Sequence, residues 1–224
     1  MDDQLENQQD FDWKHDPNWR IFRIMAEFVD GFDFIAQFDK TVTFFGSART
    51  KQDDKYYGLA RDLASRLGGE GFSIITGGGP GIMEAGNEGA KAVNVPSIGL
   101  NIELASEQRV NPYVTKSLAF QHFFTRKVML SFASQAYVFF PGGYGTLDEM
   151  FEIVTLIQTK KIQESIPVIL FGKDYWGPLC DWMKSSLLDQ HQAIDVSDLS
   201  IWTLTDDIEE AVQIIKQSPP RFHH

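Results

Sequence analysis

The hydrophobic pattern of the chain has two alternating forms. Short runs of consecutive apolar residues, several of which end in glycine, are typical of buried strands. Longer segments, in which apolar residues recur every three to four positions, are typical of helices with one buried face. The polar stretch at 103–117 is predicted as a loop. Strands are predicted at 41–46, 72–79, 96–102, 135–143 and 166–172, with a short edge strand at 201–204, and helices at 54–69, 81–93, 122–134, 146–158, 174–189 and 206–217.

This alternation predicts the fold class. Strands that are apolar along their whole length, each followed by a helix, indicate a parallel sheet covered on both faces. The predicted fold is therefore α/β, a Rossmann-like, doubly wound parallel sheet with helices on both faces. No repeat or linker divides the chain. We expect a flexible N-terminus at 1–15, a helical extension at 16–39 and one Rossmann-like domain at 40–218.

Charge and composition narrow the classes of partner. The 224-residue chain has a net charge of −11 and a pI of about 4.8, which disfavours general binding to nucleic acid or to anionic membranes. No apolar run reaches the length of a membrane-spanning helix, and the acidic start does not resemble a targeting segment. With a single cysteine, Cys180, no intrachain disulfide can form. We expect a cytoplasmic protein without nucleic-acid or membrane partners.

Glycine-rich turns follow three of the predicted strands. In an open parallel sheet, ligands bind beyond the carboxyl ends of the strands, and all three turns lie at that edge. Glycine allows the backbone to approach an anion, and the helix that follows offers free N–H groups. One such turn is explained by turn geometry alone, but three on one edge indicate a phosphate site. The predicted phosphate-binding residues are Ser47, Gly78, Gly79, Gly142, Gly143, Tyr144, Gly145 and Thr146.

Familiar nucleotide and catalytic motifs do not fit the chain. A dinucleotide fingerprint fails because Glu84 occupies the place of the third glycine, and the run follows the second strand instead of the first. There is no P-loop motif, HExxH motif, Cys/His cluster or G-x-S-x-G elbow. We therefore expect no metal and no resident cofactor.

Two charged positions lie next to the predicted phosphate site. Glu149, about one turn into the helix at 146–158, is either a first-turn acid favoured by the helix dipole or a catalytic carboxylate. Arg126 and Lys127 form a basic pair, which is usually a solvated feature. The strand after this pair leads directly into the PGGYGT turn, so the pair can supply the counter-charge for a phosphate.

These residues resemble a known family. PGGYGTLDE at 141–149, TGGGPGIMEAG at 76–86, FGSAR at 45–49 and the Arg126-Lys127 pair resemble the Lonely Guy-type cytokinin riboside 5′-monophosphate phosphoribohydrolases. That group has carried the label lysine decarboxylase, although no lysine here has the context of a pyridoxal-phosphate anchor. The resemblance implies hydrolysis of the N-glycosidic bond of an adenosine-type 5′-monophosphate. By the same resemblance, Arg126 and Glu149 are catalytic, and Lys127, Gly142, Gly143, Gly145, Thr146 and Thr155 contact substrate.

One departure leaves the base open. The segment often written E-M-H-x-R-K in the family reads HFFTRK at 122–127, which resembles a bacterial branch with an N-terminal extension. The base is then a prenylated adenine or plain adenine. A carboxylate at Glu149 can stabilise the oxocarbenium-like transition state and orient water, while Arg126 can bind the phosphate and keep Glu149 ionised. The alternative function is a non-catalytic carrier of a nucleotide or of the molybdenum cofactor.

The N-terminal extension predicts self-association. Residues 17–38 carry more large apolar side chains than one buried helix stripe needs, and a subunit interface would cover the excess. The family resemblance also implies dimers or larger assemblies. We therefore expect a homodimer or a larger homo-oligomer. The side chains concerned include Trp19, Phe22, Phe28, Phe32, Phe34 and Phe38.

Overall fold

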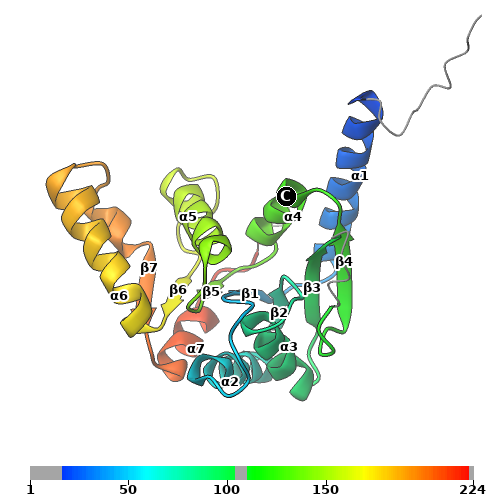
Figure 1. The fold of residues 1–224 in the computed structure, drawn as a ribbon, viewed down its shortest axis with the longest axis horizontal. Helices are drawn as coiled ribbons and strands as arrows, with labels where there is room; N and C mark the ends of the chain where they lie inside the picture. The colour runs from blue at the N-terminus through cyan, green and yellow to red at the C-terminus, as the bar shows by residue number, and fades with distance from the viewer. Residues whose placement is uncertain (1–16, 104–109, 222–224) are drawn as a thin grey trace, which may run out of the picture.

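A single parallel sheet organises the molecule (Figure 1). The computed structural model describes residues 17–103 and 110–221. Within them, seven strands pair in the order β4-β3-β2-β1-β5-β6-β7, and every neighbouring pair is parallel. The first strand is therefore central, with β2 on one side and β5 on the other. The strands are β1 (Thr41–Phe45), β2 (Ser73–Thr76), β3 (Ser97–Ile102), β4 (Lys116–Phe120), β5 (Tyr137–Phe139), β6 (Val168–Phe171) and β7 (Trp202–Thr205).

Helices cover both faces of the sheet, which confirms the predicted doubly wound α/β fold (Figure 1). One layer contains α2, α3 and α7, and the other contains α1, α4, α5 and α6. Two short helices of other types follow α6. The helices are α1 (Pro17–Ile35), α2 (Lys55–Gly69), α3 (Ile82–Ala92), α4 (Phe123–Phe132), α5 (Tyr144–Gln158), α6 (Lys173–Trp182), the π-helix η1 (Met183–Gln190), the 3-10 helix η2 (Val196–Ser200) and α7 (Ile208–Lys216).

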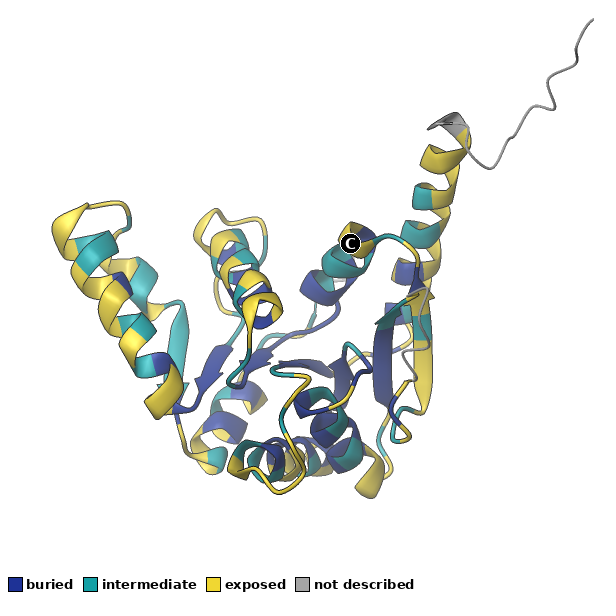
Figure 2. Cartoon of the chain, in the orientation of Figure 1, coloured by how far each residue is buried: buried dark blue, intermediate teal, exposed yellow. Residues whose placement is uncertain are grey.

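Alternation along the strands supplies two hydrophobic cores. In β1, Val42 and Phe44 face the layer of α2, α3 and α7, whereas Phe45 faces the opposite layer. In β5, Val138 and Phe139 divide in the same way. The central strands are buried on both faces, as Figure 2 shows, which is why their sequences are mostly apolar and contain no charged residue.

The N-terminal helix packs against the sheet only near its C-terminal end. Ile35 and the following Phe38 join the core of the α4–α6 layer. One turn earlier, Gly31 lies against α4, where a Cβ would come within 2.5 Å of Met129 Sδ. The N-terminal turns of α1 extend away from the body of the molecule (Figure 2). The predicted flexible segment at 1–15 falls outside the described residues.

Three local predictions need correction. The predicted loop at 103–117 overlaps β4, an edge strand whose mostly exposed residues lack the apolar run that marks the other strands. The predicted helix at 174–189 is α6 followed by the π-helix η1. The predicted strands at 72–79 and 135–143 are shorter, because their glycine-rich ends are turns. In the described ranges, no helix combines the length and apolar character needed to cross a membrane.

Candidate functional site

A large cavity lies where the central strands end. Its volume is about 890 Å³, and it opens at the carboxyl ends of β1 and β5. The sheet order changes direction between these two strands, so this is the point at which an open α/β sheet binds ligands. Four segments supply the walls: the β1–α2 loop, α4, the β5–α5 turn and the start of α6. The predicted site residues in the lining are Ser47, Arg126, Gly142, Gly143, Tyr144, Gly145, Thr146 and Glu149.

The β5–α5 turn presents uncapped backbone to this cavity. Gly143 is the N-cap of α5, and no side chain caps the helix from that position. A Cβ at Gly143 or Gly145 would meet no atom within 4 Å, so both residues border open space. Tyr175, on α6, donates a hydrogen bond to the carbonyl of Gly142 over 2.5 Å and fixes the turn. Free N–H groups at a helix N-terminus are suited to bind an anion.

Glu149 is a buried carboxyl with unmet hydrogen-bonding capacity. It is 5% exposed, and its Oε2 atom has no hydrogen-bond partner among the described residues. Burial raises the pKa of Glu149 to about 8, although Lys127 and Arg126 lower it. Both cations favour the ionised form, but desolvation outweighs them, so the expectation that Arg126 keeps Glu149 ionised stays a prediction. Such a pKa is typical of a functional carboxyl.

Arg126 approaches the cavity from α4 along a fixed path. Its Nε–H donates to the carbonyl of Leu100, within β3, over 2.6 Å. Its guanidinium passes directly over Gly77, where any Cβ would collide with Nη2. Burial lowers the pKa of Arg126, and the charge of Glu149 acts in the opposite direction. A guanidinium remains charged under these conditions, so the cavity contains one oriented, partly desolvated cation.

Lys127 and Thr155 lie outside the lining of this cavity. The Lys127 ammonium is 2.6 Å from Asp148 Oδ2 and 3.2 Å from Glu152 Oε2. Thr155 donates to the carbonyl of Phe151, within its own helix. Lys127 and Thr155 line a separate surface hollow with Asp148, Phe151 and Glu152. Their predicted substrate contacts stay predictions.

The TGGGPG turn faces the protein. The carbonyls of Gly78 and Gly79 accept hydrogen bonds from Asn111, through its backbone N–H and its side-chain amide respectively. The Gly78 N–H donates to Thr76 Oγ1. Both glycines lie outside the residues that line the cavity. The turn therefore positions other elements, and direct phosphate binding by Gly78 and Gly79 stays a prediction.

Sequence reasoning missed several residues of the cavity wall. Arg49, Thr50, Asp54, Tyr56 and Tyr175 also line it. The first four follow the Gly46-Ser47 turn, so the position of that turn was a usable signal. No sequence motif pointed to Tyr175, because this residue lies on α6, which follows strand β6. Within 17–103 and 110–221, no group of three or more His, Cys, Asp or Glu side chains is arranged to hold a metal ion.

Comparison with known proteins identifies the family. The profile of a family described as "Possible lysine decarboxylase" matches residues 83–215, more than half of the chain. The chain belongs to this family. Cytokinin riboside 5′-monophosphate phosphoribohydrolases are among the curated relatives, which confirms the resemblance seen in the sequence.

Two curated relatives illustrate the range of family activities. A probable cytokinin riboside 5′-monophosphate phosphoribohydrolase of Oryza sativa subsp. japonica is 30% identical over 130 residues, 55% of this chain and 59% of that protein. A pyrimidine/purine nucleotide 5′-monophosphate nucleosidase of Escherichia coli (strain K12) is 24% identical over 184 residues, 75% of this chain and 38% of that protein. The chain thus spans less than two thirds of either relative. At the family level, the relatives are hydrolases of N-glycosyl bonds in nucleotides.

Solved structures share the fold. A structural-genomics target has a TM-score of 0.61 and 24% identity, with 80% of this chain and 99% of that chain covered. The molybdenum cofactor carrier protein of Chlamydomonas reinhardtii has a TM-score of 0.59 and 18% identity, with 80% and 97% covered. At these identities the likeness shows a common Rossmann-like architecture.

Proposed function

We propose that this protein hydrolyses the N-glycosidic bond of a purine nucleoside 5′-monophosphate, giving the free base and ribose 5-phosphate. One observation carries the proposal. A single cavity brings together an uncapped helix N-terminus at Gly143, an oriented cation at Arg126 and a buried carboxyl at Glu149. The first feature suits a phosphate, and the other two suit a sugar that develops positive charge.

The proposed reaction breaks the bond between C1′ of the ribose and a nitrogen of the base. The electron pair leaves with the base, which takes up a proton, and a water oxygen forms the new bond to C1′. In its ionised form, Glu149 stabilises the cationic sugar and accepts a proton from the attacking water. A pKa of about 8 suits this exchange of protons near neutral pH. Arg126 binds the phosphate or the ribose hydroxyls.

The proposed substrates are adenosine 5′-monophosphate and its N6-modified forms. The rice and Escherichia coli relatives are named for activity on cytokinin riboside 5′-monophosphates and on purine and pyrimidine nucleotides, and these activities support the class of substrate. Incubation of the protein with adenosine monophosphate and with a prenylated analogue, followed by measurement of the released base, tests the proposal. Release of neither base by a protein that binds both nucleotides would contradict it.

A homodimer in the cytoplasm is the proposed state of the protein. Along α1, Phe22, Met25, Val29 and Phe32 are each about half exposed or more. Contiguous exposed apolar surface of this kind is typical of an interface. Light scattering at micromolar concentration tests this, and a monomeric mass would contradict it.

The second candidate is a carrier of a nucleotide or of the molybdenum cofactor. Its support is the likeness of the fold to carrier proteins of that cofactor. Carriage alone does not require a carboxyl with a raised pKa beside an arginine. Tight binding of a nucleotide or of the cofactor without release of base would favour this second function.

A further inference from the structure

The helix that carries Arg126 lacks a cap of its own. The N-cap residue of α4 is His122, whose side chain makes no capping hydrogen bond, and the first turn contains no acidic residue. The N–H groups at the start of a helix have no partners within it, and they form the positive end of the helix dipole. The start of α4 therefore needs an acceptor from elsewhere in the protein.

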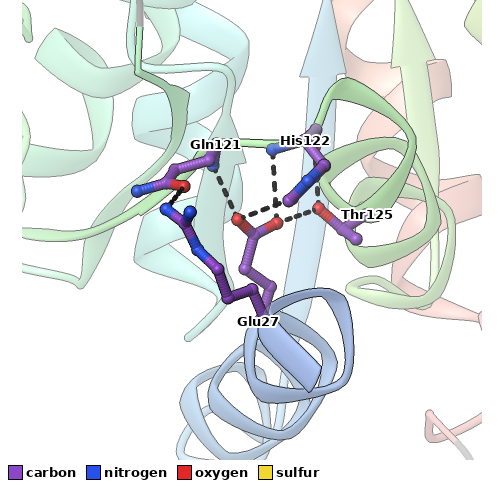
Figure 3. A network of polar contacts seen from close by, with 5 residues as sticks. Glu27, Gln121, His122 and Thr125 are labelled. Atoms are coloured by element: carbon purple, nitrogen blue, oxygen red, sulfur yellow. Dashed lines mark hydrogen bonds and ion pairs between the residues drawn. The ribbon is translucent and has the colours of Figure 1, made fainter. Parts of the chain in front are cut away.

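Glu27, on α1, supplies an acceptor at the N-cap from almost a hundred residues upstream, where it binds the backbone N–H groups of His122 and of the residue before it (Figure 3). Its Oε1 accepts the Gln121 N–H over 3.0 Å, and its Oε2 accepts the His122 N–H over 3.3 Å. Two side chains at the same helix end complete the set. The Thr125 hydroxyl lies 2.5 Å from Oε2, and His122 Nδ1 lies 3.0 Å from Oε1.

The carboxylate is held in its ionised form. The Glu27 side chain is 16% exposed. Burial raises the pKa of Glu27, but the hydrogen bonds from Thr125, His122 and Gln121 together outweigh it and leave the pKa below its ordinary value. Hydrogen bonds from N–H groups to an ionised acceptor are about twice as strong as neutral ones. Glu27 therefore acts as a charged cap supplied by another helix.

Two further contacts fix α1 on this part of the protein. Arg23 Nη2 donates to Gln121 Oε1 over 2.5 Å, one turn before Glu27. One turn after Glu27, Gly31 permits the close approach of α1 to Met129 of α4. These contacts hold α4 against α1 both at the start of α4 and in its C-terminal half.

Arg126 directly follows the last residue of this network. Its backbone N–H donates to the His122 carbonyl in the first turn of α4. Its side chain has little freedom, because Nε–H is bound to Leu100 and the guanidinium lies against Gly77. A shift of the start of α4 would therefore move the guanidinium within the cavity or break its bond to Leu100.

We propose that Glu27 is a positioning residue for Arg126: by capping α4 from the N-terminal helix, it fixes where the guanidinium meets the substrate. This inference rests on the proposed function. It gives the N-terminal extension, which lies before the residues matched by the family profile, a part in the reaction. Displacement of a catalytic group by about 1 Å can lower the rate by about a hundredfold.

A double-mutant cycle tests the proposal. Glu27→Gln is made in the natural protein and in Arg126→Lys, and turnover of adenosine monophosphate and the thermal midpoint are measured for all four proteins. In the natural protein, we expect Glu27→Gln to lower turnover about ten- to a hundredfold. In the Arg126→Lys background, the same change should lower turnover by less than about threefold. The thermal midpoint should fall equally in both backgrounds. Equal losses of turnover in both backgrounds would reduce Glu27 to a structural role and overturn the proposal.

Asp30→Asn is the matched control. Asp30 is exposed on the same helix, so the change removes the same charge without touching the start of α4. Turnover and thermal midpoint should stay as in the natural protein. If Glu27→Gln does not fold, Glu27→Asp keeps the charge with a shorter reach, and it should show the same dependence on Arg126. Full turnover in a folded Glu27→Asp and in a folded Glu27→Gln would contradict the proposal.

A measurement independent of activity separates this inference from the proposed function. The NMR signal of the Arg126 Nε–H, assigned by its absence in Arg126→Lys, reports the bond to Leu100. Its exchange with solvent should be at least about tenfold faster in Glu27→Gln than in Asp30→Asn. Unchanged protection would overturn the inference, whatever the turnover. Faster exchange in a protein that hydrolyses no nucleotide would overturn the proposed function alone.

Discussion

Two glycine-rich turns flank the central strand, and they serve opposite purposes. The turn at 142–146 faces the cavity, and its glycines Gly143 and Gly145 border open space. The turn at 77–81 faces the protein, because any side chain there would meet Arg126, Asn101 or the backbone of the β1–α2 loop. The same residue type thus leaves room for a ligand in one turn and for the protein's own atoms in the other.

The difference extends to the polar groups around each turn. Near 77–81, the buried Asn111 amide donates to the Gly79 carbonyl and to Asn87, although Asn101 Oδ1, which lies against Gly78, has no hydrogen-bond partner among the described residues. Beside 142–146, the buried Glu149 retains an oxygen without a partner. Buried polar groups are normally hydrogen-bonded, and exceptions are concentrated at functional sites. Each turn thus lies beside a buried oxygen without a partner in the described ranges, but the one near 142–146 belongs to an ionisable group that lines the cavity, whereas Asn101 lies outside the lining.

The largest effect should come from adding a side chain in the turn at 77–81, which faces the protein. Gly81 has a φ of 70°, and a Cβ there would collide with the backbone at Ser47. Gly81→Ala should lower the free energy of unfolding by about 2–4 kcal/mol, measured by urea denaturation. Gly145→Ala is the control. It lies at an open position in the first turn of α5, so its stability should stay unchanged or rise by up to about 1 kcal/mol, because alanine favours the helix over glycine. Equal losses in the two variants would erase the distinction between the turns.

The second effect concerns the unpaired carboxyl. Glu149→Gln keeps the volume of the side chain and removes its charge. Turnover of adenosine monophosphate should fall by at least about a hundredfold, since a well-placed electrostatic group is lost. Nucleotide affinity, measured by calorimetry, should hold or rise. Arg126→Ala should instead weaken both. A Glu149→Gln protein with full turnover would contradict the catalytic assignment.

A smaller effect is expected from adding a bulky side chain in the turn at 142–146, which faces the cavity. Gly143→Val places a branched side chain at the N-terminus of α5, where it meets no protein atom. Affinity for the nucleotide should fall about tenfold, or about 1.4 kcal/mol, while the thermal midpoint changes little. The 5′-hydroxyl nucleoside, which lacks the phosphate, is the reference ligand. If the nucleoside loses as much affinity as the nucleotide, the turn does not bind the phosphate.

The smallest effect is a dependence of stability on pH. Between the ordinary carboxyl pKa of about 4.5 and the raised pKa of about 8, folded Glu149 keeps a proton that the unfolded chain has lost. Stability from this group therefore decreases as pH rises through that window. The thermal midpoint of Glu149→Gln relative to the natural protein should rise from pH 5 to pH 8 by about 3 °C or more. A constant difference would show that Glu149 is already ionised at pH 5.

The hydrophobic pattern was sufficient for the central sheet but not for its edge. Strands β1, β5 and β6 are buried on both faces, and their sequences are mostly apolar, with the two threonines of β1 as the exceptions. Strand β4 is an edge strand, and its exposed residues Lys116 and Ser117 make it look like a loop. Edge strands commonly carry charged residues, which hide them from this kind of reasoning.

The candidate site was predictable in its parts, and its geometry was not. Consecutive residues on a helix point in different directions, so Arg126 could enter the cavity only if Lys127 faced elsewhere. Sequence order does not indicate which of the two does so. The contact between Glu27 and the start of α4 also had no local signal, because the helix end and its cap are distant in the chain.

The central position of β1 has a consequence for synthesis of the protein. Although β1 is the first strand to be made, its pairing with β5 must wait until β2, β3 and β4 have been translated. Such long-range pairings form slowly, and an unpaired apolar strand is prone to aggregate. The cavity cannot close before β5 docks beside β1. Any nascent chain that stops before β5 would expose the apolar flank of β1 and would lack the cavity.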